Sequence, residues 1–175
     1  VGSEMCIRDR ENLAMALRRG KSRGLGWGIK KNEKDFYREA LAQLDLGLQT
    51  RMTSKVGLLS GGQRQALTLL MATLQKPKLL LLDEHTAALD PKTARKVLDL
   101  TEKIVDEQNL TALMVTHNMK DAIQIGNRLI MMHEGRIIYD VAGEEKKNLQ
   151  VEDLLERFEK VSGEEFANDR MMLAK

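Results

Sequence analysis

Two short segments carry residues that could bind phosphate groups and react with them. The first is 59–63, Leu-Ser-Gly-Gly-Gln, directly before a helix-forming run that continues to Leu74. Two glycines at a helix start leave backbone N–H groups open to an anion, because no bulky side chain covers them and the helix dipole is positive there. The second is the apolar run 79–82, which the carboxylates of Asp83 and Glu84 follow. One such carboxylate can hold Mg²⁺ while the next orients a water.

These carboxylates have to be positioned by the strand that precedes them. Four leucines without alternation are typical of a parallel strand buried on both faces, and open α/β sheets hold their ligands at the carboxyl ends of the strands. A second apolar run, 111–116, predicts another buried strand that delivers His117 to the same edge. We therefore expect Asp83, Glu84 and His117 to converge there.

Cap and turn signals predict the remaining elements. Helices are expected over 11–19, 32–44 and about 91–107, the last opened by Asp90 and Pro91. Alternation of these helices with strands indicates an α/β fold with a parallel sheet.

The C-terminal part shows a different pattern. Two strands over 128–132 and 136–139, with a turn between them, predict a hairpin that closes the sheet. An amphipathic helix is expected over about 151–160, and the last residues are expected to fray.

In this order the segments resemble the motifs of ABC ATPases. Residues 59–63 resemble the signature sequence, 79–84 the Walker B strand, 87–90 the D-loop, and His117 the switch histidine. Four motifs in family order are far more specific than any one of them alone. The resemblance covers about 11–140 and implies a P-loop NTPase-like cassette fragment, in which helices flank a parallel sheet, with a helical subdomain and a C-terminal β-hairpin.

The resemblance also implies which motifs are missing. A complete ABC ATPase begins with a β-rich portion that holds an adenine-stacking aromatic, the phosphate loop (Walker A) and the glutamine loop, and none of these is found here. Residues 20–22 match the last three residues of the phosphate-loop pattern. However, Met15 stands where that pattern requires glycine, and a helix is predicted where the pattern requires a preceding strand. The chain therefore resembles the C-terminal portion of a cassette.

Four stretches are predicted on this basis. Residues 1–10 do not continue the family pattern and predict a non-native segment such as a sequencing scar, with a genuine N-terminal extension as the alternative. Residues 11–75 are expected to form the helical subdomain with the signature. Residues 76–145 would be the C-terminal part of the RecA-like ATPase core, and 146–175 a helical tail.

The family works as a head-to-tail pair, which implies roles for the signature residues. Ser60, Gly61 and Gly62 would donate to the γ-phosphate of ATP held by the second subunit, and Gln63 would fix the helix start. Asp90 would report to the opposite site.

The resemblance gives the Walker B end its roles as well. Asp83 would hold Mg²⁺, Glu84 would polarise the attacking water as general base, and His117 would sense the γ-phosphate. The alternatives are a solvated strand end for the two carboxylates and a structural role for the histidine. Most family members have proline where His85 stands, which leaves the local geometry beside Glu84 open.

The implied function is the ATP-hydrolysing subunit of an ABC importer for a small solute. The sequence of residues 51–78 and 126–140 most resembles that of the ATPase subunits of bacterial importers predicted to carry aromatic amino acids. Its partners would be a second ATPase subunit, transmembrane permease subunits and, indirectly, a solute-binding protein. It would lie in the cytoplasm, peripheral on the inner face of the cell membrane, and this chain alone is expected to be inactive. A non-transport ABC ATPase of DNA repair or translation and a half-cassette acting in trans are the alternatives.

Composition limits these possibilities further. With 175 residues, 42% hydrophobic and 31% charged, the chain is expected to be globular with a core. The longest clean apolar stretch, 67–74, is far shorter than the roughly 20 residues of a membrane helix. A net charge of +2 and an aromatic content of 3% do not favour nucleic-acid binding. The single cysteine, Cys6, excludes an internal disulfide. Six lysines and arginines between Arg18 and Lys31 predict either a solvated loop or a contact with anionic lipid or a membrane subunit.

Overall fold

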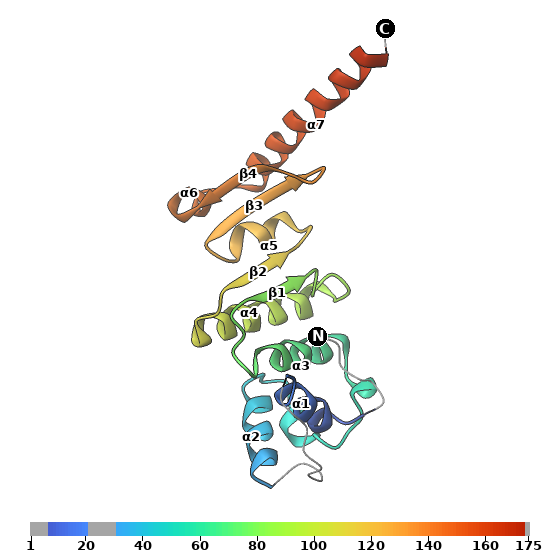
Figure 1. Cartoon of the computed structure of the whole chain (residues 1–175), viewed down its shortest axis with the longest axis vertical. Helices are drawn as coiled ribbons and strands as arrows, with labels where there is room; N and C mark the ends of the chain where they lie inside the picture. Colours follow the sequence, from blue (N-terminus) through green and yellow to red (C-terminus); the bar gives the residue numbers. More distant parts are fainter. Residues whose placement is uncertain (1–6, 21–30, 174–175) are drawn as a thin grey trace. The chain divides into compact units, whose positions relative to one another are not determined.

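A computed structural model describes residues 7–20 and 31–173. The chain divides into two compact units, 1–115 (unit 1) and 116–175 (unit 2). The described elements of unit 1 are α1 (Asp9–Leu17), α2 (Lys31–Ala42), the short 3₁₀ helices η1 (Leu48–Thr50) and η2 (Val56–Leu58), α3 (Gly61–Thr73), β1 (Leu80–Asp83), α4 (Pro91–Gln108) and β2 (Ala112–Val115) (Figure 1). Those of unit 2 are α5 (Met119–Gln124), β3 (Arg128–His133), β4 (Arg136–Ala142), α6 (Gly143–Lys147) and α7 (Val151–Leu173).

Strands β1 and β2 of unit 1 pair in parallel, as the apolar runs predict. Leu80 lies opposite Ala112, and Asp83 lies opposite Val115. The connection between them contains α4, which runs alongside the strands in Figure 1. Asp90 caps the start of α4, and Asn109 ends it with φ 51° in the left-handed region. The βαβ arrangement therefore follows from cap signals that are visible in the sequence.

The prediction that the first strand is buried on both faces is wrong for unit 1. Leu80 and Leu82 are buried, whereas Leu81 is 65% exposed. On β2, Leu113 and Val115 are 53% and 52% exposed. Successive strand residues point to opposite faces, so the core of unit 1 covers only one face of this two-stranded sheet.

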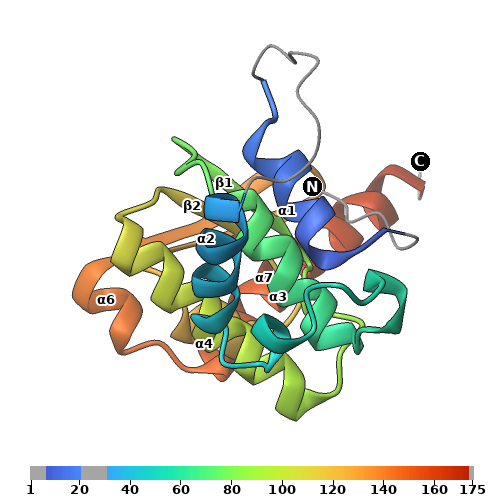
Figure 2. The ribbon, with the colours of Figure 1, turned by 90° about the horizontal axis from the view of Figure 1, so that it is seen from below.

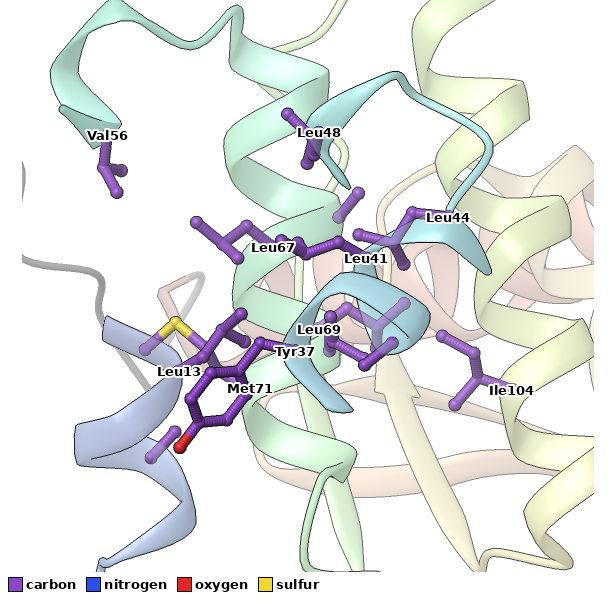
Figure 3. Close-up of a cluster of buried hydrophobic side chains, with 14 of the residues drawn as sticks. Leu13, Tyr37, Leu41, Leu44, Leu48, Val56, Leu67, Leu69, Met71 and Ile104 are labelled. Carbon is purple, nitrogen blue, oxygen red and sulfur yellow. The ribbon is translucent and has the colours of Figure 1, made fainter. Parts of the chain in front are cut away.

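The core of unit 1 lies mainly among its helices. In Figure 3, side chains from α1, α2, α3 and α4 meet, among them Leu13, Tyr37, Leu67 and Ile104. Figure 2 shows α2 and α3 side by side from another direction. Each fully buried leucine contributes about 1.5–3 kcal/mol. This packing gives the signature helix α3 a fixed support.

Helix α1 begins two residues earlier than the sequence predicts. Arg8 N–H donates to Glu11 Oε2 over 3.0 Å, and the Arg8 guanidinium donates to Glu11 Oε1 over 2.8 Å. Asp9 N–H donates to Ser54 O over 3.3 Å. These contacts satisfy first-turn groups that would otherwise be open. Of the basic segment, only its ends are described, and there Arg18 pairs with Glu33 at 3.0 Å. The segment's centre, with Trp27 and most of 20–22, lies outside the described residues, as does Cys6.

Unit 2 is built on the predicted hairpin. Strands β3 and β4 are antiparallel, with a bulge between Met131 and Met132. Within unit 2 they form a two-stranded sheet, and the closure of the parallel sheet by this hairpin stays a prediction. Their inner side packs on α6 and α7 in a separate core of Leu129, Tyr139, Val141, Leu149 and Leu154. Helix α7 begins at Val151 as expected but continues to Leu173. Within the described ranges, no helix combines the length and apolar character needed to span a bilayer.

Candidate functional site

The signature segment starts α3 with a complete capping box. Ser60 is the N-cap, and its Oγ accepts from Gln63 N–H over 3.3 Å. In return, Ser60 N–H donates to Gln63 Oε1 over 3.1 Å. Gln63 Nε2 also donates to Leu46 O over 3.3 Å, which ties the helix start to the chain after α2. In its bond with Gln63 N–H, Ser60 Oγ is the acceptor, so the Ser60 hydroxyl hydrogen remains available to an acceptor outside the helix.

The two glycines that follow have different surroundings. Ser60 and Gly61 are exposed, whereas Gly62 is buried. A Cβ on Gly61 would lie 3.0 Å from Leu89 Cδ2, and a Cβ on Gly62 would overlap the Thr93 methyl group, Cγ2. First-turn N–H groups have no acceptor within their own helix, so Gly61 and Gly62 bring two backbone donors to this end of α3. Sequence reasoning missed the packing of Gly62 on Thr93, because nothing local signals it.

The two carboxylates sit where β1 ends, as predicted. Both Asp83 and Glu84 are exposed. Glu84 has φ 41°, in the left-handed region that side chains rarely adopt. Its N–H donates to Val115 O and its carbonyl accepts from Ala87 N–H, each over 3.0 Å. The reversal at Glu84 breaks the strand alternation directly after Asp83, and its hydrogen bonds hold this turn in place.

The register brings the carboxyl ends of the two parallel strands to one edge. Asp83 lies opposite Val115. His117 follows Val115 by two residues and belongs to unit 2, where it is exposed. There Asn118 caps α5, accepting from Lys120 N–H over 3.0 Å. The convergence of His117 with the two carboxylates stays a prediction.

Asp90 is held by the first turn of α4. Its Oδ1 accepts from Thr93 N–H over 3.1 Å. Hydrogen bonds from the Thr93 side chain and backbone hold the pKa of the Asp90 carboxyl below its usual range. Asp90 is therefore an anion whose orientation is fixed by its role as helix cap.

His85, the departure from the usual proline, is anchored on the middle of α4. Its Nε2 lies 3.2 Å from Thr101 Oγ1. Thr101 gives its one hydroxyl hydrogen to Val97 O over 2.7 Å, so His85 Nε2–H is the donor of this pair. Burial lowers the pKa of His85, which keeps the ring neutral. The sequence showed that this position is unusual but not which residue it contacts.

Magnesium fits one of these groups. Mg²⁺ is usually held by one or two carboxylates together with waters and substrate phosphates. Asp83 supplies an exposed carboxylate at a strand end. Among residues 7–20 and 31–173 there is no group of three or more metal-binding side chains. A magnesium ion here would thus take most of its ligands from water and a nucleotide.

The sequence of the chain is similar to those of known proteins. A family model described as "ABC transporter" matches residues 4–87. The chain is 52% identical over 150 residues to a tyrosine transport ATP-binding protein of Clostridioides difficile (strain R20291), covering 86% of this chain and 59% of that protein. It is 38% identical over 117 residues to an aliphatic sulfonates import ATP-binding protein, SsuB 2, of Agrobacterium fabrum, covering 67% of this chain and 44% of that one.

The fold has solved counterparts as well. The ATP-binding cassette MJ0796, in a dimeric post-hydrolysis state bound to ADP and Pi, superposes with a TM-score of 0.63 at 28% identity, covering 80% of this chain and 58% of that one. The chain thus spans less than two thirds of the length of these relatives. The predicted α/β cassette fold is confirmed, and the chain belongs to the ABC transporter family, in which it forms part of an ATP-binding cassette.

Proposed function

We propose that this chain is part of the ATP-hydrolysing subunit of an ABC importer. The observation that carries the proposal is that one compact unit holds both a capped signature helix start and a carboxylate pair at the end of a parallel strand. Relatives named as transport and import ATP-binding proteins support it. The exposed signature and carboxylates are the surfaces that such a subunit would present to nucleotide.

The signature end of α3 would close over ATP held by a second subunit in a head-to-tail dimer. Its donors would be the Ser60 hydroxyl and the N–H groups of Gly61 and Gly62, because α3 points its positive end in their direction. Gln63 would keep these donors in place through the capping box. The dimeric state of the cassette bound to ADP and Pi supports this arrangement.

The β1 end would serve the ATP of its own subunit. When bound, Mg²⁺ would neutralise charge on the phosphates, and Asp83 would hold it, in part through water. Glu84 would orient and deprotonate the attacking water. His117 would contact the γ-phosphate, and Asp90 would face the opposite site. The chemistry asked of these residues is positioning and charge stabilisation, as phosphoryl transfer requires.

The cargo and partners follow from the relatives. A tyrosine transport protein at 52% identity supports an aromatic amino acid as cargo. Permease subunits would span the membrane, and a solute-binding protein would deliver the cargo to them. The subunit would lie on the inner face of the cell membrane, with 11–75 as the helical subdomain and 76–145 as part of the ATPase core.

A chimera tests the proposal. The segment of the Clostridioides difficile relative that matches this chain is replaced by the chain's own residues, which restores a full-length cassette. We expect Mg²⁺-dependent ATP hydrolysis by the chimera, and a loss of about 10²–10⁴-fold in kcat in Glu84→Gln, the range for removal of a general base. The matched control is Glu134→Gln, a change in the turn of the hairpin, which should hydrolyse ATP normally. ATP hydrolysis by Glu84→Gln at a near-normal rate would contradict the assignment of Glu84 as general base.

A further inference from the structure

Gly62 and Thr93 form a close packing between α3 and α4. Gly62 is buried, and helices α3 and α4 contact each other within unit 1. A Cβ at position 62 would overlap Thr93 Cγ2, yet it would lie 3.7 Å from Thr93 Cβ, an ordinary van der Waals distance. The conflict is therefore with a single methyl group. Gly62 is helical, so its backbone does not require glycine; the neighbouring methyl group does.

The same threonine also holds Asp90. Its N–H donates to Asp90 Oδ1 over 3.1 Å, and its side chain bonds the same carboxyl. Pro91 fixes the backbone between these two residues. Thr93 is β-branched and stiff, so its methyl group cannot turn away from Gly62 without disturbing the bond to Asp90. One residue thus contacts both the signature segment and the turn before α4.

We propose that Thr93 is a positioning residue that locks the start of the signature helix to the Asp90 turn, so that the two segments are displaced only together. The functional part of this inference rests on the proposed function, since it assumes that both segments face nucleotide. The competing explanation is that Gly62 is needed only so that phosphate can approach its backbone. In that case alanine at position 62 would leave the chain's own packing unaffected.

Unfolding measurements on the purified 175-residue chain distinguish the two explanations. We expect Gly62→Ala to lower the midpoint of urea unfolding by about 1 M, from the usual penalty of overpacking and the m-value of a domain of this size. It should also shift the amide resonances of Asp90 and Thr93. Thr93→Ser removes the methyl group and keeps the hydroxyl, so Gly62→Ala/Thr93→Ser should return the midpoint and both resonances to the values of Thr93→Ser alone.

Two matched controls sharpen this test. Thr93→Val keeps a methyl group and should not rescue Gly62→Ala. Gly61→Ala meets only the flexible end of Leu89 at 3.0 Å, so its smaller effect should not change with Thr93→Ser. An unchanged midpoint in Gly62→Ala, or an equal loss with and without Thr93→Ser, would overturn the inference.

Activity in the chimera then tests the positioning role. Gly62→Ala should lower kcat at least tenfold with little change in KM for ATP, because ATP is held mainly by the phosphate loop of the other subunit, and Thr93→Ser should restore kcat. Rescue of unfolding without rescue of kcat would overturn the positioning role and assign Gly62 to phosphate contact. If the unsubstituted chimera hydrolyses no ATP, the proposed function fails instead, while the unfolding data still decide the packing.

Discussion

His85 Nε2 donates to Thr101 Oγ1 across 3.2 Å, which ties the turn after β1 to the middle of α4. Thr101 is buried, with 3% of its surface exposed. The bond lies next to Glu84, whose backbone has φ 41°. A left-handed residue costs about 1 kcal/mol and persists only where neighbouring contacts hold it. His85 supplies one such contact, in a place where the family usually has proline.

Removing the acceptor should therefore weaken unit 1. We expect Thr101→Val to lower the free energy of unfolding by about 1–2 kcal/mol, because the half-buried N–H of His85 loses its partner. Thr101→Ser keeps the hydroxyl and should lose less. Urea unfolding of the chain checks both variants. Equal losses in Thr101→Val and Thr101→Ser would mean that packing, not the hydrogen bond, explains the effect.

The capping box predicts a second stability effect. Ser60→Ala removes the oxygen that accepts from Gln63 N–H and should cost about 1 kcal/mol. Ser60→Asp also accepts this bond and places a negative charge at the positive end of α3, so it should retain the stability. Thermal unfolding of the three proteins gives the comparison. A stable Ser60→Ala would show that the helix start is held by tertiary packing alone.

Asp9 should make the chain less stable as the pH rises. It is fully buried, and neither of its carboxylate oxygens has a hydrogen-bond partner. Burial raises the pKa of Asp9 to about 6, with partial compensation from the Arg51 charge. Because the folded state binds the proton more tightly than the unfolded chain, stability falls as pH rises from about 4 to 6 and stays low above that.

The corresponding substitution is Asp9→Asn. We expect it to raise the free energy of unfolding at pH 7.5 by about 1–3 kcal/mol and to flatten the pH dependence between 4 and 6, on the basis of the energy per pKa unit. Urea titrations at several pH values provide the measurement, with Asp35→Asn, an exposed carboxylate, as control. If Asp9→Asn and the unsubstituted chain show the same pH dependence, the Asp9 carboxylate is reached by water.

Two adjacent lysines in α6 should behave very differently. Lys146 is buried, and its ammonium donates to Ile123 O and, over 3.0 Å, to Ile125 O at the end of α5. Lys147 is exposed and pairs with Glu144. We expect Lys146→Met to cost about 1.5–3 kcal/mol, because α5 loses a charged cap, and Lys147→Met to cost less than about 0.5 kcal/mol. Hydrogen exchange of the α5 amides reports the difference, and similar exchange in both variants would contradict it.

Local signals in the sequence predicted much of unit 1. Ser60 and Gln63 mark the start of α3, and Asp90 with Pro91 marks the start of α4, because caps depend on neighbouring residues. The apolar runs predicted the parallel strands, and Asp83 and Glu84 lie at a strand end as expected.

The errors and omissions concern contacts between distant parts of the chain. Leu81 belongs to an unbroken apolar run, yet it is exposed, because the burial of a strand face depends on what packs over it. The sequence predicts only a phosphate contact for Gly62, since its packing on Thr93 is not visible in either segment. The acceptors of Lys146 and the partner of His85 likewise come from other elements. Composition and periodicity report which side chains are apolar, not which surfaces meet.

The uncovered side of the β1–β2 sheet affects how the chain behaves in solution. Leu81, Leu113 and Val115 form an apolar strip on two short strands. Such strips attract copies of the same chain, and exposed strand edges template intermolecular pairing. Purified by itself, the chain should self-associate as its concentration rises and should be retained by the chaperones that recognise extended apolar segments. Its solubility is thus a direct readout of whether that side of the sheet has been covered.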